Sequence, residues 1–143
     1  MKKINFLLTL IIFISTISII SCNKDNTDSG PQPIDDPRDK FVGNWTCTEV
    51  SQLYPTQTPF TVGISLSTSN STQILISNFY HFGTSEYATG VVLDNSVTLP
   101  QQTVCNMSVH GSGTLETPTK ITWKYYVNDA ADIDTVSATY VKQ

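Results

Sequence analysis

Residues beyond Phe41 form a series of short segments in which apolar side chains recur at every second position, with turn-forming residues between them. The alternation is clearest over residues 59–68 and 120–128. Because successive side chains of a β-strand point to opposite faces, this period of two predicts half-buried strands. Eight such segments are present: 43–53, 59–68, 72–82, 86–93, 96–99, 106–116, 120–128 and 134–142.

Short turns join the eight expected strands, which predicts an all-β antiparallel meander. Asp94-Asn95 is a hairpin signal, and Pro100 is expected to end the fifth strand because proline cannot donate to a ladder. Closure of a meander removes its exposed edges, so the pattern favours an eight-stranded up-and-down barrel over residues 41–143. A two-sheet β-sandwich is the alternative.

The first 21 residues resemble the signal peptide of a bacterial lipoprotein. Two lysines precede a mostly apolar run, and the run ends in Ile-Ile-Ser-Cys at residues 19–22, which resembles a lipobox. The resemblance implies cleavage before Cys22 and a diacylglycerol on its thiol. Two or more acyl chains hold a protein stably on a bilayer, so the membrane is the expected partner of Cys22. A plain secretory signal or a transmembrane anchor is the alternative.

Residues 22–40 are expected to be a lipidated, flexible tether. They are rich in Asn, Asp, Ser, Gly and Pro and hold one aliphatic side chain, Ile34, so they cannot bury a core. Among lipoproteins, an Asp after the lipidated cysteine favours the inner membrane. Asn23 stands there, so we expect an outer-membrane lipoprotein of the cell envelope, facing either the periplasm or the cell surface.

Charge and cysteine content limit the partners. Eight Lys and Arg stand against twelve Asp and Glu, without a basic patch, which argues against nucleic-acid binding. Outside the expected lipidation site, Cys47 and Cys105 remain. An even pair in an oxidising compartment predicts a disulfide between them; two separate thiols are the alternative.

The two ends of the expected barrel resemble those of the calycin superfamily, the lipocalins and fatty-acid-binding proteins. The first strand opens with Phe41-Val42-Gly43-Asn44-Trp45, and the last contains Lys142. The resemblance implies a lipocalin-like barrel with Trp45 as the plug of one end and Lys142 packed over it. It departs from fatty-acid-binding proteins, because the only arginine is Arg38, outside the barrel, and the helical lid has no room.

Three aromatic residues, Tyr87, Trp123 and Tyr125, are candidates to line a ligand cavity or simply to fill it. The interior of an eight-stranded barrel is filled by side chains or holds one small ligand. Many large inward residues favour a mostly filled interior. Glu49 shares strand parity with Trp45, so it is a candidate for an inward carboxyl that needs a partner or a raised pKa. A bulge that turns Glu49 outward is the alternative.

No residue pattern indicates catalysis, a metal or a cofactor. His81 and His110 have no suitably spaced partners, and the acidic hairpin from Asn128 to Asp134 lacks the order of a calcium loop. We therefore expect a non-enzymatic protein that binds a small hydrophobic ligand or none. The alternative is an interaction or structural lipoprotein that binds a protein or glycan through its outer surface, where Tyr80, Phe82 and Tyr126 could be exposed.

Overall fold

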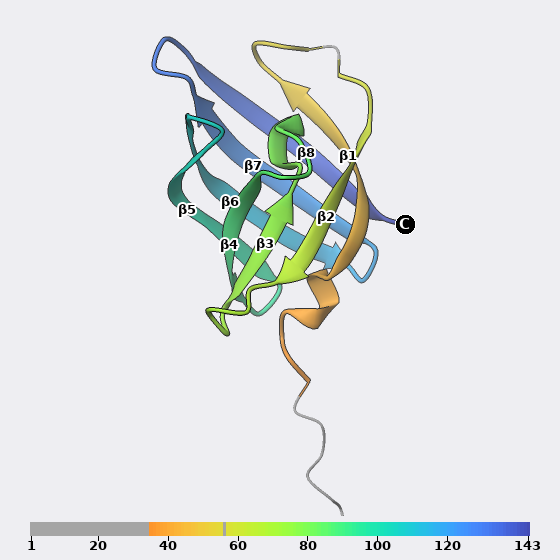
Figure 1. The fold of residues 1–143 in the computed structure, drawn as a ribbon. Helices are drawn as coiled ribbons and strands as arrows, with labels where there is room; N and C mark the ends of the chain where they lie inside the picture. The colour runs from red at the N-terminus through yellow and green to blue at the C-terminus, as the bar shows by residue number, and fades with distance from the viewer. Residues whose placement is uncertain (1–34, 56) are drawn as a thin grey trace, which may run out of the picture. The chain divides into compact units, whose positions relative to one another are not determined.

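The computed structural model describes residues 35–55 and 57–143, which form a closed eight-stranded antiparallel barrel (Figure 1). Each strand pairs with the next along the chain, and the first pairs with the last. The elements are η1 (Asp39–Phe41), β1 (Gly43–Ser51), β2 (Phe60–Leu66), β3 (Gln73–Ser77), η2 (Phe79–His81), β4 (Tyr87–Leu93), β5 (Ser96–Val104), β6 (Met107–Thr117), β7 (Lys120–Asn128) and β8 (Ile133–Lys142).

The predicted lipocalin-like barrel is confirmed, and the sandwich alternative is wrong. Cys22, the expected signal peptide and all of the tether before Asp35 lie outside the described residues. Within the described part of the chain, no helix has the length and apolar character needed to cross a membrane.

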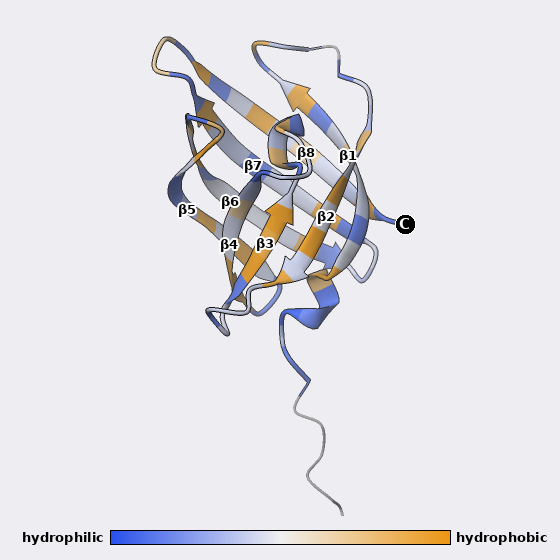
Figure 2. Ribbon diagram, in the orientation of Figure 1, coloured by the Kyte–Doolittle hydropathy of each residue, from blue (hydrophilic) through white to orange (hydrophobic). Residues whose placement is uncertain are grey.

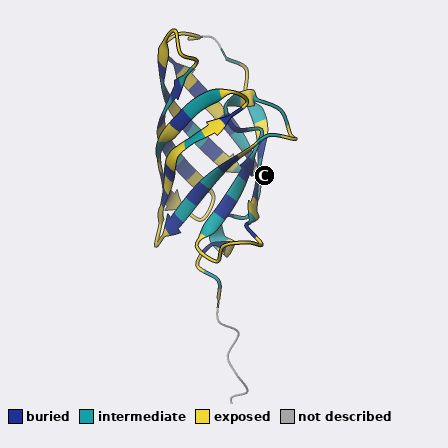
Figure 3. Ribbon diagram, turned by 60° about the vertical axis from the view of Figure 1, so that its left-hand side comes forward, coloured by how far each residue is buried: buried dark blue, intermediate teal, exposed yellow. Residues whose placement is uncertain are grey.

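The apolar side chains that recur at every second position point into the barrel, and the polar ones between them point outward. In β7, buried residues alternate with half-buried or exposed ones along the whole strand. Figures 2 and 3 show the same banding of hydropathy and burial on the neighbouring strands. The largest side chains that are fully buried are Trp45, Tyr125, Tyr140, Phe41 and Phe79.

Two glycines of β6 make room for the aromatic residues of β7. Gly111 pairs with Tyr125 and Gly113 with Trp123. A Cβ atom at Gly113 would lie 2.5 Å from the indole ring of Trp123, and one at Gly111 would lie 2.5 Å from Tyr125. The glycines therefore leave room for the bulky rings in the interior.

The largest errors in the expected strand ends are in the third and fifth strands. The third strand ends at Ser77, not at residue 82, because the chain turns into η2. The fifth continues past Pro100 to Val104, with a register shift between Leu99 and Gln102. The amide of the Gln102 side chain bonds both the N–H and the C=O of Thr89, at 2.7 Å each, so a side chain replaces part of the β4–β5 ladder.

The end of the barrel that carries η1, here called the η1 end, is closed by packing. The Trp45 Nε1–H donates to the Phe41 carbonyl at 2.8 Å, and the Lys142 Nζ lies 5.2 Å from the centroid of the Trp45 ring. This cation–π contact covers the plug.

Arg38 belongs to the barrel and not to a free tether. Its side chain is buried, forms an ion pair with Asp36 at 2.6 Å and donates to three carbonyls, those of Ser67, Asn70 and Gln73. Hydrogen bonding to Arg38 lowers the pKa of Asp36 to about 2. Arg38 is therefore part of the compact unit Asp35–Gln143.

Candidate functional site at the η2 end of the barrel

The opposite end of the barrel, here called the η2 end, is closed by a short segment with an unusual backbone. Asn78, Tyr80 and His81 have φ angles of 56°, 52° and 62°. Asparagine tolerates this left-handed region, whereas tyrosine and histidine seldom adopt it. Each such residue costs roughly 1–3 kcal/mol unless its surroundings compensate, and such residues cluster at functional sites.

Long-range contacts hold η2 in this conformation. Phe79 is fully buried, with its ring centroid 4.5 Å from that of Tyr125. The ring of His81 stacks on Phe60 at 4.7 Å, and the Asn78 Nδ2 donates to the Thr61 carbonyl at 2.8 Å. Phe79 is therefore the apolar plug of this end.

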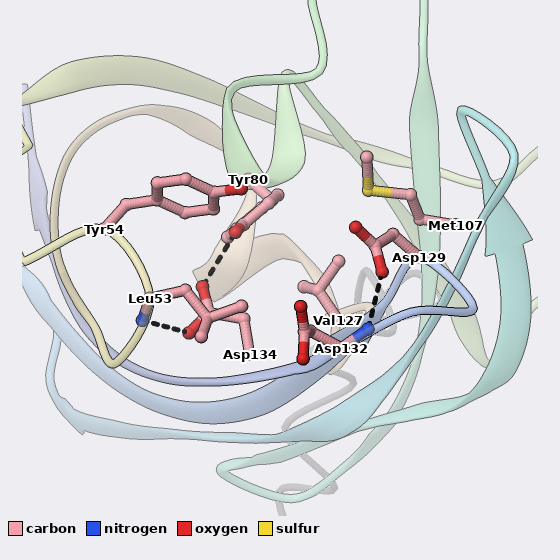
Figure 4. A pocket seen from close by; sticks show the side chains of 8 residues that line it. All are labelled: Leu53, Tyr54, Tyr80, Met107, Val127, Asp129, Asp132 and Asp134. Carbon is pink, nitrogen blue, oxygen red and sulfur yellow. Dashed lines mark hydrogen bonds between the residues drawn. The ribbon is translucent and has the colours of Figure 1, made fainter.

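Asp134 is a second anchor for η2, and its carboxylate is fully hydrogen-bonded. It is 2% exposed and accepts from the Tyr80 hydroxyl at 2.7 Å and the Ser51 hydroxyl at 2.5 Å. The backbone N–H groups of Gln52 and Leu53 donate to its other oxygen; Figure 4 shows the Tyr80 and Leu53 bonds. Burial raises the pKa of Asp134, but these donors outweigh it and leave the pKa below its usual value.

Glu49 is the less satisfied of the two buried carboxyls. It is 4% exposed, and its Oε1 accepts from the Tyr125 hydroxyl and, weakly, from the Cys47 thiol at 3.7 Å. Its Oε2 has no hydrogen-bond partner. Burial is the main cause that raises the pKa of Glu49, so this carboxyl favours its protonated form far more than Asp134 does.

Two further buried polar atoms inside the barrel lack partners, the Trp123 Nε1 and the Tyr140 hydroxyl. The rings of these two residues lie 5.4 Å apart, and Tyr140 pairs with Cys47 across the β1–β8 ladder. Burial raises the pKa values of Tyr125 and Tyr140 well above 10, so both hydroxyls stay protonated. Each unpaired buried group costs roughly 1–3 kcal/mol of stability. These atoms are unusual because buried polar groups in protein cores are normally hydrogen-bonded.

A small acidic pocket lies at the entrance. Its volume is about 40 Å³, room for a few water molecules and far below the roughly 300–1,000 Å³ of small-molecule sites. Figure 4 shows the residues that line it: Leu53, Tyr54, Tyr80, Met107, Val127, Asp129, Asp132 and Asp134. With Phe79 and Tyr80 in place, the entrance does not admit a ring-sized molecule.

A larger hollow at the η1 end is a weaker candidate. Its volume is about 260 Å³, and it is lined by Lys40, Asn95, Leu115, Glu116, Thr117 and Pro118. Of these, Leu115 alone is buried. The hollow therefore has no buried polar group that could recognise a ligand.

The sequence-based candidates divide into interior and exterior residues. Trp123 and Tyr125 point into the barrel, where they fill space instead of lining a cavity. Tyr87 was expected beside them, but it is 50% exposed, because Ala88 and Gly90 are the inward residues of β4.

The structure contradicts the predicted disulfide. Cys47 and Cys105 are both free thiols. Cys47 is buried inside the barrel on β1, whereas Cys105 lies exposed in the turn between β5 and β6, with a φ angle of 49°. Burial, followed by the charge of Glu49, raises the pKa of the Cys47 thiol.

The histidines lie on the outside of the barrel. His110 is exposed and stacks on Tyr126, with ring centroids 4.9 Å apart, while His81 stacks on Phe60. Tyr80 and Phe82 are half-buried and pack edge to face at the η2 end, so they do not form an exposed patch. Over residues 35–55 and 57–143, no three His, Cys, Asp or Glu side chains are grouped to hold a metal ion.

Sequence reasoning missed the roles of Phe79 and Asp134. Asp134 shares strand parity with the inward residues Val136, Ala138 and Tyr140, and that parity was the available signal for a buried carboxylate. Phe79 carried no such signal, because an aromatic residue beside Tyr80 fits an extended strand equally well.

Comparisons with known proteins support the fold. No protein-family model matches this sequence, and no curated protein matches it. Among solved structures, the chain is similar to EF1p2_mFAP2b bound to DFHBI, with 12% identity, a TM-score of 0.55 and coverage of 76% of this chain and 98% of that one. It is also similar to a redesigned β-barrel, b11L5F_LGL, with 12% identity, a TM-score of 0.56 and coverage of 78% and 99%. The chain thus folds as a small lipocalin-like β-barrel.

Proposed function

We propose that this protein is a membrane-anchored lipoprotein of the cell envelope whose barrel binds a small, largely apolar molecule at the η2 end, without catalysis. The observation that carries the proposal is the Phe79 plug. A strained backbone holds the Phe79 ring against Tyr125, whose hydroxyl bonds to Glu49, a buried carboxyl with one unpartnered oxygen. A ligand that replaces the ring would reach that oxygen and relieve the backbone.

The energetics of such an exchange are favourable for a weak-to-moderate binder. Removal of the Phe79 side chain from the interior loses roughly 1.5–3 kcal/mol of apolar burial. Relaxation of Tyr80 and His81 to ordinary φ angles returns roughly 1–3 kcal/mol each. Opening also breaks the Tyr80–Asp134 and Asn78–Thr61 hydrogen bonds and the His81–Phe60 stack, so the open form is a minor population that a ligand selects. The cost of opening lowers the apparent affinity in proportion to the fraction of open molecules.

The proposed membrane anchor is Cys22, and the proposed location in the cell envelope is inferred from the sequence around it. Acyl chains on Cys22 would hold the barrel at the outer membrane, facing the periplasm or the surface, where small apolar molecules partition. One similar barrel is described as bound to DFHBI; that belongs to the other protein and supports only the principle that a barrel of this size accepts a small molecule.

Native mass spectrometry of the protein taken from its own envelope tests the proposal. A co-purifying small molecule is the expected result, and the Phe79→Trp variant, whose larger plug occupies the site, should lose it. A clean mass of the lipidated chain alone, together with no binding by the Phe79→Ala variant, would reject ligand binding. For the anchor, Cys22→Ala should move the protein from the membrane fraction to the soluble fraction, and persistence in the membrane would reject lipidation.

A second function is favoured by a different observation, the filled interior. A barrel packed with Trp45, Tyr125 and Tyr140 can act as a rigid scaffold that presents its outer surface to an envelope protein or glycan. The side chains of Tyr54 and Tyr87 are 57% and 50% exposed on this surface. Loss of partner capture in the double variant Tyr54→Ser and Tyr87→Ser, with η2 left intact, would support this function over the first.

A further inference from the structure

The two buried ionisable side chains with carboxyl groups, Glu49 and Asp134, both lie at the η2 end. The buried charged side chains among the described residues are Arg38, Glu49 and Asp134. Arg38 lies at the η1 end, where Asp36 and three backbone carbonyls occupy its donors. An anion entering at the η2 end would therefore meet two carboxyls and no buried base, which excludes the usual recognition of an acid.

Glu49 is the carboxyl that the fold leaves open. Asp134 receives four donors from its own chain, whereas the Oε2 of Glu49 receives none although the residue is 4% exposed. A buried carboxyl oxygen without a partner is costly. The Tyr125 hydroxyl fixes the other oxygen, so the open oxygen is held in place by a neighbouring side chain.

Aromatic faces surround the approach to Glu49. The Phe79 ring lies on Tyr125 at 4.5 Å, and the Tyr80 ring meets Tyr125 edge to face at 6.3 Å. Displacement of Phe79 would uncover the ring of Tyr125 directly beside its bond to Glu49. An aromatic face next to a carboxylate is an environment that attracts organic cations.

The acidic residues at the entrance add a negative electrostatic potential that acts over a longer range. Asp129, Asp132 and Asp134 line the pocket (Figure 4). Hydrogen bonds from its own loop lower the pKa of Asp129, and hydrogen bonds from Ser51 and Tyr80 lower that of Asp134 against the effect of burial. Acidic walls at a narrow entrance concentrate cations and speed their association.

We propose that the ligand of the η2 end is an organic cation, an ammonium group on a ring-sized apolar body, and that the Glu49 carboxylate is its counter-ion. This inference rests on the proposed function. The apolar body takes the position of the Phe79 ring, and an ammonium N–H donates to the Oε2 of Glu49. Burial raises the pKa of Glu49, so at a pH below that pKa each bound ammonium displaces one proton from Glu49 to the solvent, which balances the charge.

The surroundings of Glu49 give this exchange a defined pH dependence. The titratable groups that face it are Cys47 on β1, Tyr125 on β7, Tyr140 and Asp134 on β8, and Tyr80 on η2. Burial raises the pKa values of the thiol and of the three hydroxyls, so they stay neutral. Ammonium binding should therefore tighten about tenfold per pH unit below the pKa of Glu49 and level off above it.

Three probes of similar size test the inference: 2-phenylethylamine, 2-phenylethanol and phenylacetate. Each is titrated by calorimetry into the full-length lipidated protein in nanodiscs, with empty nanodiscs as the blank. We expect the amine to bind at least tenfold more tightly than the alcohol, and phenylacetate to bind most weakly. Titrations in two buffers of different ionisation heat, repeated over a range of pH, should report proton release that falls as the pH rises through the pKa of Glu49.

Variants assign the effect to Glu49. Glu49→Gln should bring the affinity for the amine to within about threefold of that for the alcohol and abolish proton release. Glu116→Gln removes an exposed carboxyl at the η1 end and should change neither value. If Glu49→Gln does not fold, the three-probe ranking and the proton count on the unaltered protein still decide.

The outcomes separate the inference from the function on which it rests. If the alcohol or phenylacetate binds as tightly as the amine, or proton release is absent at every pH, the site is a ligand site without a counter-ion and the inference is overturned. If none of the three probes binds either the unaltered protein or Phe79→Ala, the inference and the proposed binding function both fail.

Discussion

The two ends of the barrel are closed in opposite ways. At the η1 end, Trp45 donates to a backbone carbonyl beneath Lys142, and Arg38 ties the incoming chain to the β2–β3 turn. At the η2 end, Phe79 and Tyr80 close the barrel on a backbone with positive φ angles, above a carboxyl with an unpartnered oxygen. The contrast separates a closure that stabilises the fold from one that can open.

The largest expected loss of stability comes from a substitution at the η1 end. Trp45→Ala removes a fully buried indole and its hydrogen bond, so we expect a loss of about 3–5 kcal/mol of unfolding free energy. Denaturant unfolding with a global probe measures it. A loss below about 1 kcal/mol would mean that this end does not support the fold.

The matching change at the other end should cost less. Phe79→Ala also removes a fully buried ring, but relaxation of the strained η2 backbone offsets part of the loss, so we expect roughly 1–3 kcal/mol. Binding of 2-phenylethylamine should also tighten, because the plug is gone. A cost equal to that of Trp45→Ala, with no gain in binding, would make both ends structural.

The fold was largely predictable from local pattern, and the site was not. Alternation over residues such as 120–128 predicted the barrel, since strand parity is a local property. The end of β3 was mispredicted because aromatic residues at 79–82 suit a strand, and only distant partners, Tyr125 for Phe79 and Asp134 for Tyr80, turn this segment inward.

Other errors have the same physical origin. Tyr87 was placed inside because bulk usually faces a core, but Val97 and Ile74 already fill the space above Gly90, where a Cβ would lie 2.5 Å from Val97. The predicted disulfide required Cys47 and Cys105 to approach, and that depends on barrel geometry that spacing along the chain does not encode.

A charge test at the η2 end should give a moderate effect. The pKa of Glu49 is raised in the folded protein, so its stabilising contribution is present below the unfolded pKa and is lost as pH rises through the folded pKa. The slope reaches at most about 1.4 kcal/mol per pH unit. In Glu49→Gln this decline should disappear; an unchanged profile between pH 4 and 8 would show that Glu49 does not titrate there.

The corresponding test at the η1 end has the opposite sign. The pKa of Asp36 is lowered to about 2 by Arg38, so the stability gained from this pair is present above pH 3.8 and is lost as pH falls toward 2. Arg38→Met should lower the denaturation midpoint at pH 7 and flatten this acid limb. A variant with an unchanged limb would show that the pair does not couple to folding.

The smallest expected effect concerns the hydrogen bond between the Tyr80 hydroxyl and the Asp134 carboxylate. Tyr80→Phe removes one of four donors to a buried carboxylate, and we expect a loss of about 1 kcal/mol. Opening of η2 should become easier, so 2-phenylethylamine should associate faster. Slower association would show that the Tyr80 hydroxyl guides the ligand and does not hold the plug.

Native-state hydrogen exchange tests most directly whether one end opens while the other stays closed. The N–H groups of His81 and Phe82 are bonded within η2, whereas that of Phe41 is bonded to Arg38 at the η1 end. We expect His81 and Phe82 to exchange through local opening, at least 2 kcal/mol below global unfolding, and to be protected at least tenfold by saturating 2-phenylethylamine. Exchange of both ends at the global unfolding free energy, unchanged by the amine, would contradict the account.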